Sequence, residues 1–126
     1  MPVVLKIDPH RQVVYSAFYG KLTETEMLGH RDMIAADPDV KPHFNEIVDF
    51  SAVTEVDISD SSLAGMAANP SLYDESVFHI VVAPADLLFR IASKYKDLAR
   101  LSRPNLLVVR TREEAYQLLA DGSGTK

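Results

Sequence analysis

Side chains that could act on a ligand gather in the short sequence DISDSS, at residues 57–62. They are Asp57, Ser59, Asp60, Ser61 and Ser62. A strand is expected before them, at 44–50, and a helix is expected to begin near residue 59 or 60. A helix N-terminus has unpaired N–H groups and a positive dipole end, which suit phosphate or carboxylate. We therefore predict a ligand-binding or regulatory site here, with phosphorylation of a serine as one form. An ordinary N-cap, which contributes about 1 kcal/mol, is the structural alternative.

The other reactive residues form no catalytic or metal-binding motif. The sequence has no cysteine, no G-x-S-x-G nucleophile elbow and no glycine-rich phosphate loop. His10, His30, His43 and His79 do not have the spacing of a metal site. His79 lies within an apolar stretch and is expected to be a hydrogen-bonded core residue. We predict no catalytic residue, no metal and no cofactor; an enzyme centred on the turn Asp49–Ser62 is the weakest alternative.

A basic band is the second candidate surface. Residues 90–112 carry seven Lys or Arg and one Asp, whereas residues 1–89 carry five Lys or Arg and fourteen Asp or Glu. Positions four apart lie on the same side of a helix. This spacing joins the members of the band in pairs, Arg90 with Lys94 and Lys96 with Arg100. A solvated helix face is one interpretation; docking to an acidic protein, to anionic lipid headgroups or to the acidic part of a second copy is the other.

The composition limits the class of protein. The chain has 126 residues, of which 47% are hydrophobic and 25% charged, as in ordinary globular domains. The net charge of −5 argues against a nucleic-acid partner. The sequence has no apolar run of membrane-spanning length and no secretion signal, so we expect a cytoplasmic protein without membrane insertion. A single domain is predicted over residues 1–121 and a flexible tail over 122–126.

The hydrophobic periodicity predicts nine elements that would position these groups. Strands are expected at 3–7, 13–19, 44–50, 77–83 and 106–110, and helices at 24–36, 60–68, 86–102 and from 112 onward. The order ββαβαβαβα predicts an α/β fold with a mixed, mostly parallel five-stranded sheet and about four helices, placed on both faces or against one.

Local signals support these boundaries. Asp8–Arg11 has the turn residues of a hairpin between the first two strands. Thr23 with Glu26, and Thr111 with Glu114, have the spacing of capping boxes. On the first helix, His30 is expected to lie off the apolar face.

Three motifs resemble STAS domains, and especially the SpoIIAA-like proteins, which are small stand-alone bacterial proteins. Phe18–Thr23 resembles the turn that ends the hairpin of these domains. Val48–Val53 resembles their strand end with Asp and Ser, and Asp57–Ser62 is similar to their regulatory loop. The resemblance runs from Val3 to about Ala120 and implies a SpoIIAA-like (STAS-like) fold.

The chain departs from that family at the regulatory serine. In STAS domains a phosphorylatable serine opens the helix after the loop, and a glycine follows. Aligned without gaps, Ile58 stands at the serine position. An insertion of three would align Asp60, Ser61 and Ser62 instead, and Leu63 then stands where the glycine should be. The resemblance therefore implies the fold more than it implies a phosphorylation switch.

Together these observations predict a non-catalytic interaction or regulatory module that acts through protein–protein contacts, as a homodimer. The alternative, suggested by the SEC14-type relation of the fold, is a small carrier that binds an apolar or lipid-like ligand in a cleft. Three aromatic residues could line such a cleft or a dimer face, namely Tyr73, Phe89 and Tyr95.

Overall fold

A computed structural model describes residues 3–124 of the chain, with side chains for residues 3–121. It contains a five-stranded sheet in the order β1-β2-β3-β4-β5. The strands are β1 (Val3–Asp8), β2 (Val13–Thr23), β3 (Asn45–Asp57), β4 (His79–Val82) and β5 (Leu106–Val109); the helices are α1 (Glu24–Ala36), α2 (Asp60–Ala68), α3 (Asp86–Leu98) and α4 (Arg112–Gly124). β1 pairs antiparallel with β2, and the other neighbours pair in parallel. The predicted mixed α/β sheet with four helices is confirmed.

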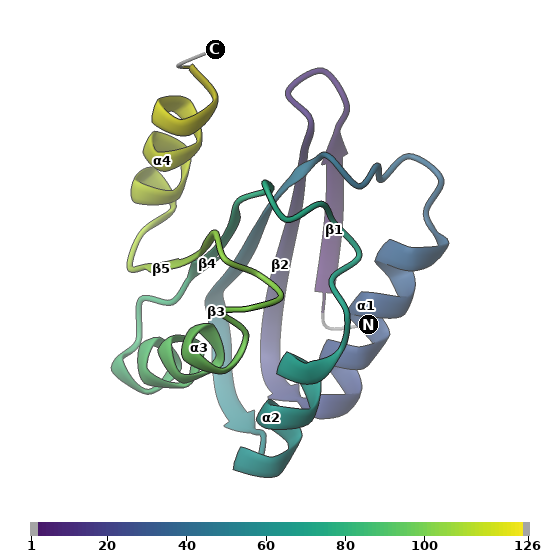
Figure 1. Cartoon of the computed structure of the whole chain (residues 1–126). Helices are drawn as coiled ribbons and strands as arrows, with labels where there is room; N and C mark the ends of the chain where they lie inside the picture. Colours follow the sequence, from purple (N-terminus) through teal and green to yellow (C-terminus); the bar gives the residue numbers. More distant parts are fainter. Residues whose placement is uncertain (1–2, 125–126) are drawn as a thin grey trace.

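The strand order explains where the helices lie. Each parallel strand is added on the same side of the previous one, so right-handed crossovers place α1, α2 and α3 on the same face of the sheet. α4 follows the last strand and packs against β3, β4 and β5 from the opposite face. Figure 1 shows α4 standing apart from the other three helices. The helices therefore cover both faces unequally.

The alternation of side chains along the strands divides the core between these faces. Phe18, Val48 and Val81 belong to the cluster that meets α3, whereas Ile47 and Ile80 belong to the cluster beneath α4. A parallel register places side chains of paired residues side by side on one face. Val48 is paired with Val81 in this way, and Ile47 with Ile80. The face beneath α1–α3 is the one that holds the candidate site.

β2 and β3 are longer than the sequence predicted. β2 continues beyond Tyr19 to Thr23, and β3 continues beyond Phe50 to Asp57. The pairing shifts register between Ala17 and Tyr19 and again between Gly20 and Lys21, and Gly20 has φ +76, a conformation that favours glycine. The extended ribbon carries Leu22 into the cluster beneath α3. Hydrogen bonding between the two strands therefore extends both of them beyond the ends that the sequence predicted.

Two helix ends also differ from the prediction. α3 ends at Leu98, four residues before Ser102. The backbone N–H of Ala99 makes the last bond of the helix, to the Tyr95 carbonyl, and the N–H groups of Ser102 and Arg103 then donate to the Ala99 carbonyl in a turn. α4 continues to Gly124, inside the expected tail 122–126. A helix that is already formed gains one hydrogen bond with each added residue, which offsets the low helix propensity of glycine. Thr125 and Lys126 lie outside the described residues.

Candidate functional site

The predicted Asp/Ser site contains the cap of α2, and its groups bond both one another and neighbouring elements; Asp57 lies 3.9 Å from Lys21 Nζ of β2. Ser59 is the N-cap of α2: its Oγ accepts from the backbone N–H of Ser62 at 3.1 Å and lies 3.2 Å from the Oγ of Ser61. The Ser62 hydroxyl donates to Glu24 of α1 at 3.0 Å. Asp60 pairs with Lys94 of α3 at 2.9 Å. These contacts match the structural alternative, an N-cap; modification or ligand binding at this turn stays a prediction.

The turn expected to join Asp49 to Ser62 does not exist as one unit, because β3 runs to Asp57. Asp49 is buried on the face beneath α4, where it accepts a hydrogen bond from the Tyr15 hydroxyl and lies 3.6 Å from Arg112 Nε. Burial, and then the hydrogen bond to Asp49, raise the pKa of Tyr15 to about 12. Ser62 bonds α1 on the other face. The two ends of the expected enzyme centre are therefore separated by the sheet.

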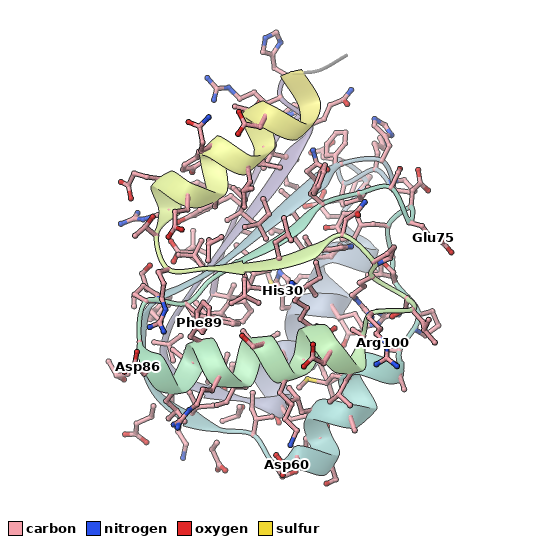
Figure 2. The ribbon with its side chains drawn as sticks, turned by 60° about the vertical axis from the view of Figure 1, so that its left-hand side comes forward. His30, Asp60, Glu75, Asp86, Phe89 and Arg100 are labelled. Carbon is pink, nitrogen blue, oxygen red and sulfur yellow. The ribbon has the colours of Figure 1, made fainter. Side chains whose placement is uncertain are left out.

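The basic band is exposed on α3 and just beyond it, as expected. Figure 2 shows its last member, Arg100, near the C-terminal end of α3. Its members are Arg90, Lys94, Lys96 and Arg100. Lys94 pairs with Asp60, and Arg100 donates to the Asp97 carbonyl at 2.9 Å. These are bonds of a solvated helix face, and docking of the band to an acidic partner, to lipid headgroups or to a second copy stays a prediction.

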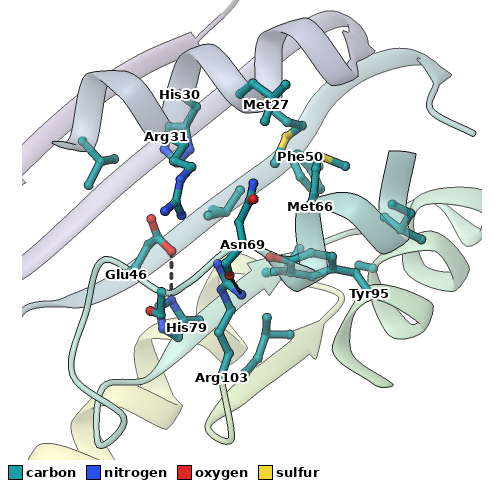
Figure 3. A pocket seen from close by; sticks show the side chains of 18 of the residues that line it. Met27, His30, Arg31, Glu46, Phe50, Met66, Asn69, His79, Tyr95 and Arg103 are labelled. Atoms are coloured by element: carbon teal, nitrogen blue, oxygen red, sulfur yellow. Dashed lines mark hydrogen bonds and ion pairs between the residues drawn. The ribbon is translucent and has the colours of Figure 1, made fainter. Parts of the chain in front are cut away.

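A cavity that the sequence did not place lies between the sheet and helices α1, α2 and α3 (Figure 3). Its volume is about 150 Å³. Most of its lining is apolar, with Phe50 and Val48 from the sheet and Leu63, Met66 and Leu88 from the helices. Of the three aromatic residues expected at a cleft, Tyr73 and Tyr95 line it. Phe89 is not part of the lining, because it packs beneath the guanidinium of Arg110 at 4.0 Å.

One end of the cavity is polar, and it lies where the parallel strands begin. Glu46 and His79 are paired in register at the start of β3 and β4, so their side chains stand together on the cavity face. His79 Nδ1 lies 3.0 Å from Glu46 Oε1, and the Tyr73 hydroxyl donates to Glu46 Oε2 at 3.3 Å. Burial opposes the charge of Glu46, but the hydrogen bond and charge of His79 outweigh it and lower the pKa of Glu46. The site thus holds a buried, partnered carboxylate, and the expectation for His79 is confirmed.

His30 is buried beside this group, contrary to the expectation that it would lie off the apolar face of α1. Only 6% of its surface is exposed. Its Nε2 lies 2.7 Å from the Oγ of Ser16, which is buried on β2, and its ring contacts Phe18 edge-on. The Ser16 partner removes the cost of burying the imidazole. Burial lowers the pKa of His30, against the opposing charge of Glu46, so the ring is neutral at pH 7.

Two arginines complete the polar end. Arg31 enters from α1, and Arg103 enters from the loop after α3 (Figure 3). Arg103 donates to the carbonyl of Asn69 at 3.2 Å and lies over the ring of Tyr95. Arg31 is half-buried and has no hydrogen bond or ion pair with another residue in 3–121. The cavity therefore joins an apolar pocket to a cluster in which one cation is unpaired.

Within residues 3–124, no group of three metal-ligating side chains is close enough to hold an ion. No helix in this part of the chain is long and apolar enough to cross a membrane.

The sequence carried a weak signal for the polar end. His79 is the one polar residue of β4, and Glu46 directly precedes the apolar Ile47 and Val48 of β3; polar residues at such positions need partners when they are buried. Pairing them required the knowledge that β3 and β4 are neighbours, which the sequence did not provide. Arg31 gave no signal, because an arginine on an amphipathic helix is normally exposed.

Comparison with known proteins supports the fold. No family model matches the sequence, and no curated protein matches it either. The structure is similar to the crystal structure of an uncharacterised protein of the DUF3478 family, with a SpoIIAA-like fold, from Shewanella loihica PV-4. The two share 13% sequence identity over 93% of each chain, with a TM-score of 0.54. The chain therefore has a SpoIIAA-like fold, as the motifs implied.

Proposed function

We propose that the protein is a non-catalytic binding protein that holds a small, mainly apolar ligand in the cavity beneath α1–α3. This is the carrier alternative of the sequence analysis. The observation that carries it is the cavity of about 150 Å³ with its largely apolar lining. An apolar cavity of this volume accommodates a molecule of about the size of benzene.

The lining residues leave this space unfilled. Larger side chains at Ala92 or Leu63 could fill it, and a ligand that occupies it gains van der Waals contacts with the apolar lining.

The polar groups of the cavity are held in place by the protein. Glu46 is bonded to both His79 and Tyr73, and His30 is bonded to Ser16. Each histidine uses one ring nitrogen in these bonds. The bonds fix the polar side chains in the cavity wall, as in a preformed binding site.

A titration with 1-hexanol tests this function. We expect the methyl NMR signals of Met66 and Leu63 to shift in a saturable way, because both side chains line the cavity. At ten times the Kd, the alcohol should stabilise the fold by about 1.4 kcal/mol and raise Tm by roughly 4–8 °C.

A cavity-filling variant and a matched control locate the binding. Ala92→Met extends a buried side chain of the lining and should weaken binding at least about tenfold while the protein stays folded. Ala64→Met makes the same change on the exposed side of α2 and should leave binding unchanged. Equal hexanol affinity in the wild type and the Ala92→Met variant would show that the alcohol binds elsewhere, and the proposal would fall.

A further inference from the structure

The unpaired Arg31 indicates the chemical class of the ligand. Its side chain is half-buried in the cavity wall, and no other residue in 3–121 bonds it. A guanidinium presents five N–H donors and keeps its charge at any physiological pH. When such a group is partly removed from water, an anion that accepts its hydrogen bonds recovers the lost hydration.

The carboxylate at the polar end does not pair with Arg31. Glu46 is bonded to His79 and Tyr73 and makes no ion pair with Arg31. Arg103 already donates a hydrogen bond to the Asn69 carbonyl, so Arg31 is the arginine whose N–H donors remain available to a ligand.

The arrangement of the cavity limits the rest of the molecule. The polar end lies at the start of β3 and β4, where Glu46 and His79 stand, and the other end is formed by Phe50, Leu63 and Ile58. A ligand that spans the cavity therefore has a charged head at one end and an apolar body at the other. The volume of about 150 Å³ fits a single ring or a chain of roughly six carbons.

We propose that the ligand is an anionic amphiphile, a monocarboxylate with a short apolar body, whose head binds Arg31. This inference rests on the proposed function and adds the chemical class of the ligand. A planar carboxylate matches the fork of a guanidinium with two parallel hydrogen bonds. A single negative charge balances the single charge of Arg31 beside the anionic Glu46, whereas a doubly charged phosphate would add repulsion.

Three probes of equal chain length test the head group at neutral pH: hexanoate, 1-hexanol and hexylamine. Isothermal titration of the wild type should give the highest affinity for hexanoate, about tenfold or more above hexanol, as expected of a hydrogen bond to a charged group. Hexylamine should bind more weakly than hexanol. Comparable affinity for hexanoate and hexanol, or a preference for hexylamine, would overturn the inference while leaving an apolar binding site in place. No binding of any of the three would overturn the proposed function as well.

Two arginine variants assign the preference to its residue. Arg31→Met keeps much of the side-chain volume and should reduce hexanoate affinity to that of hexanol, with hexanol binding retained. Arg90→Met removes the same charge from the exposed face of α3, outside the lining, and should leave the preference unchanged. A preference for hexanoate that survives in Arg31→Met would contradict the role of Arg31. If that variant does not fold, the three-probe series on the wild type still decides the ligand class.

Discussion

Single residues define the chemistry of the cavity, and they were the hardest part to predict. Glu46 and His79 are separated by 33 positions in the chain, and their contact depends on the register of β3 against β4. Arg31 stands out because its side chain has no partner among the side chains of residues 3–121, and no sequence pattern predicts such an absence. By contrast, the capping boxes were readable, because Thr23 with Glu26 and Thr111 with Glu114 are three residues apart and bond as predicted.

Buried His30 predicts a specific loss of stability in mild acid. The pKa of His30 is lowered in the folded protein by burial, whereas an unfolded histidine titrates near 6.5. As the pH falls below about 6.5, the unfolded chain binds a proton that the folded chain does not. The free energy of unfolding should therefore fall by up to about 1.4 kcal/mol per pH unit, and the full contribution of His30 should be present above that pH.

Urea unfolding between pH 7.5 and 5.5 measures this effect. His30→Gln should flatten the pH dependence, since the amide does not titrate. His43→Gln, which changes an exposed loop residue, should keep the slope of the wild type. A slope that persists unchanged in His30→Gln would show that another group is responsible.

At the scale of elements, the turn between β3 and α2 contains the N-cap of α2, and ligand binding or modification at this turn stays a prediction. The order and type of the nine elements were readable from hydrophobic periodicity, because strand and helix patterns differ in period. The ends of β2 and β3 were not, since their extension depends on pairing between the two strands and on the register shifts on either side of Tyr19 and Gly20. The correct location of Asp57 on a strand therefore required the tertiary structure.

The cap makes a prediction about α2. Ser59 Oγ accepts the N–H of Ser62, so Ser59→Ala should lower the free energy of unfolding by about 1 kcal/mol. Ser61→Ala is the matched control, because its exposed hydroxyl contacts Ser59 Oγ and caps no N–H; its cost should stay within about 0.5 kcal/mol. Urea denaturation at pH 7.5 compares them. Equal costs for the two substitutions would argue against Ser59 as the cap.

At the scale of the whole molecule, the fold is a consequence of adding each parallel strand beside the previous one. This order places three helices on one face, and the space that they enclose with the sheet becomes the cavity. The fold class followed from the order of the elements, and the SpoIIAA-like fold followed from motifs such as Val48–Val53 in that order. The cavity could not be predicted from the sequence. Its size depends on the distance between the sheet and the helices and on how the side chains fill that space, and neither can be read from one sequence.

Ligand binding in this cavity is the property on which the proposed function depends. A crystal structure of the protein soaked with 6-bromohexanoate measures it, because anomalous scattering locates the bromine without assumptions about the ligand. We predict the bromine among Phe50, Leu63 and Leu88, with the carboxylate at Arg31. A cavity that is closed by its own side chains, or a bromine found only outside it at saturating concentration, would contradict the proposed function.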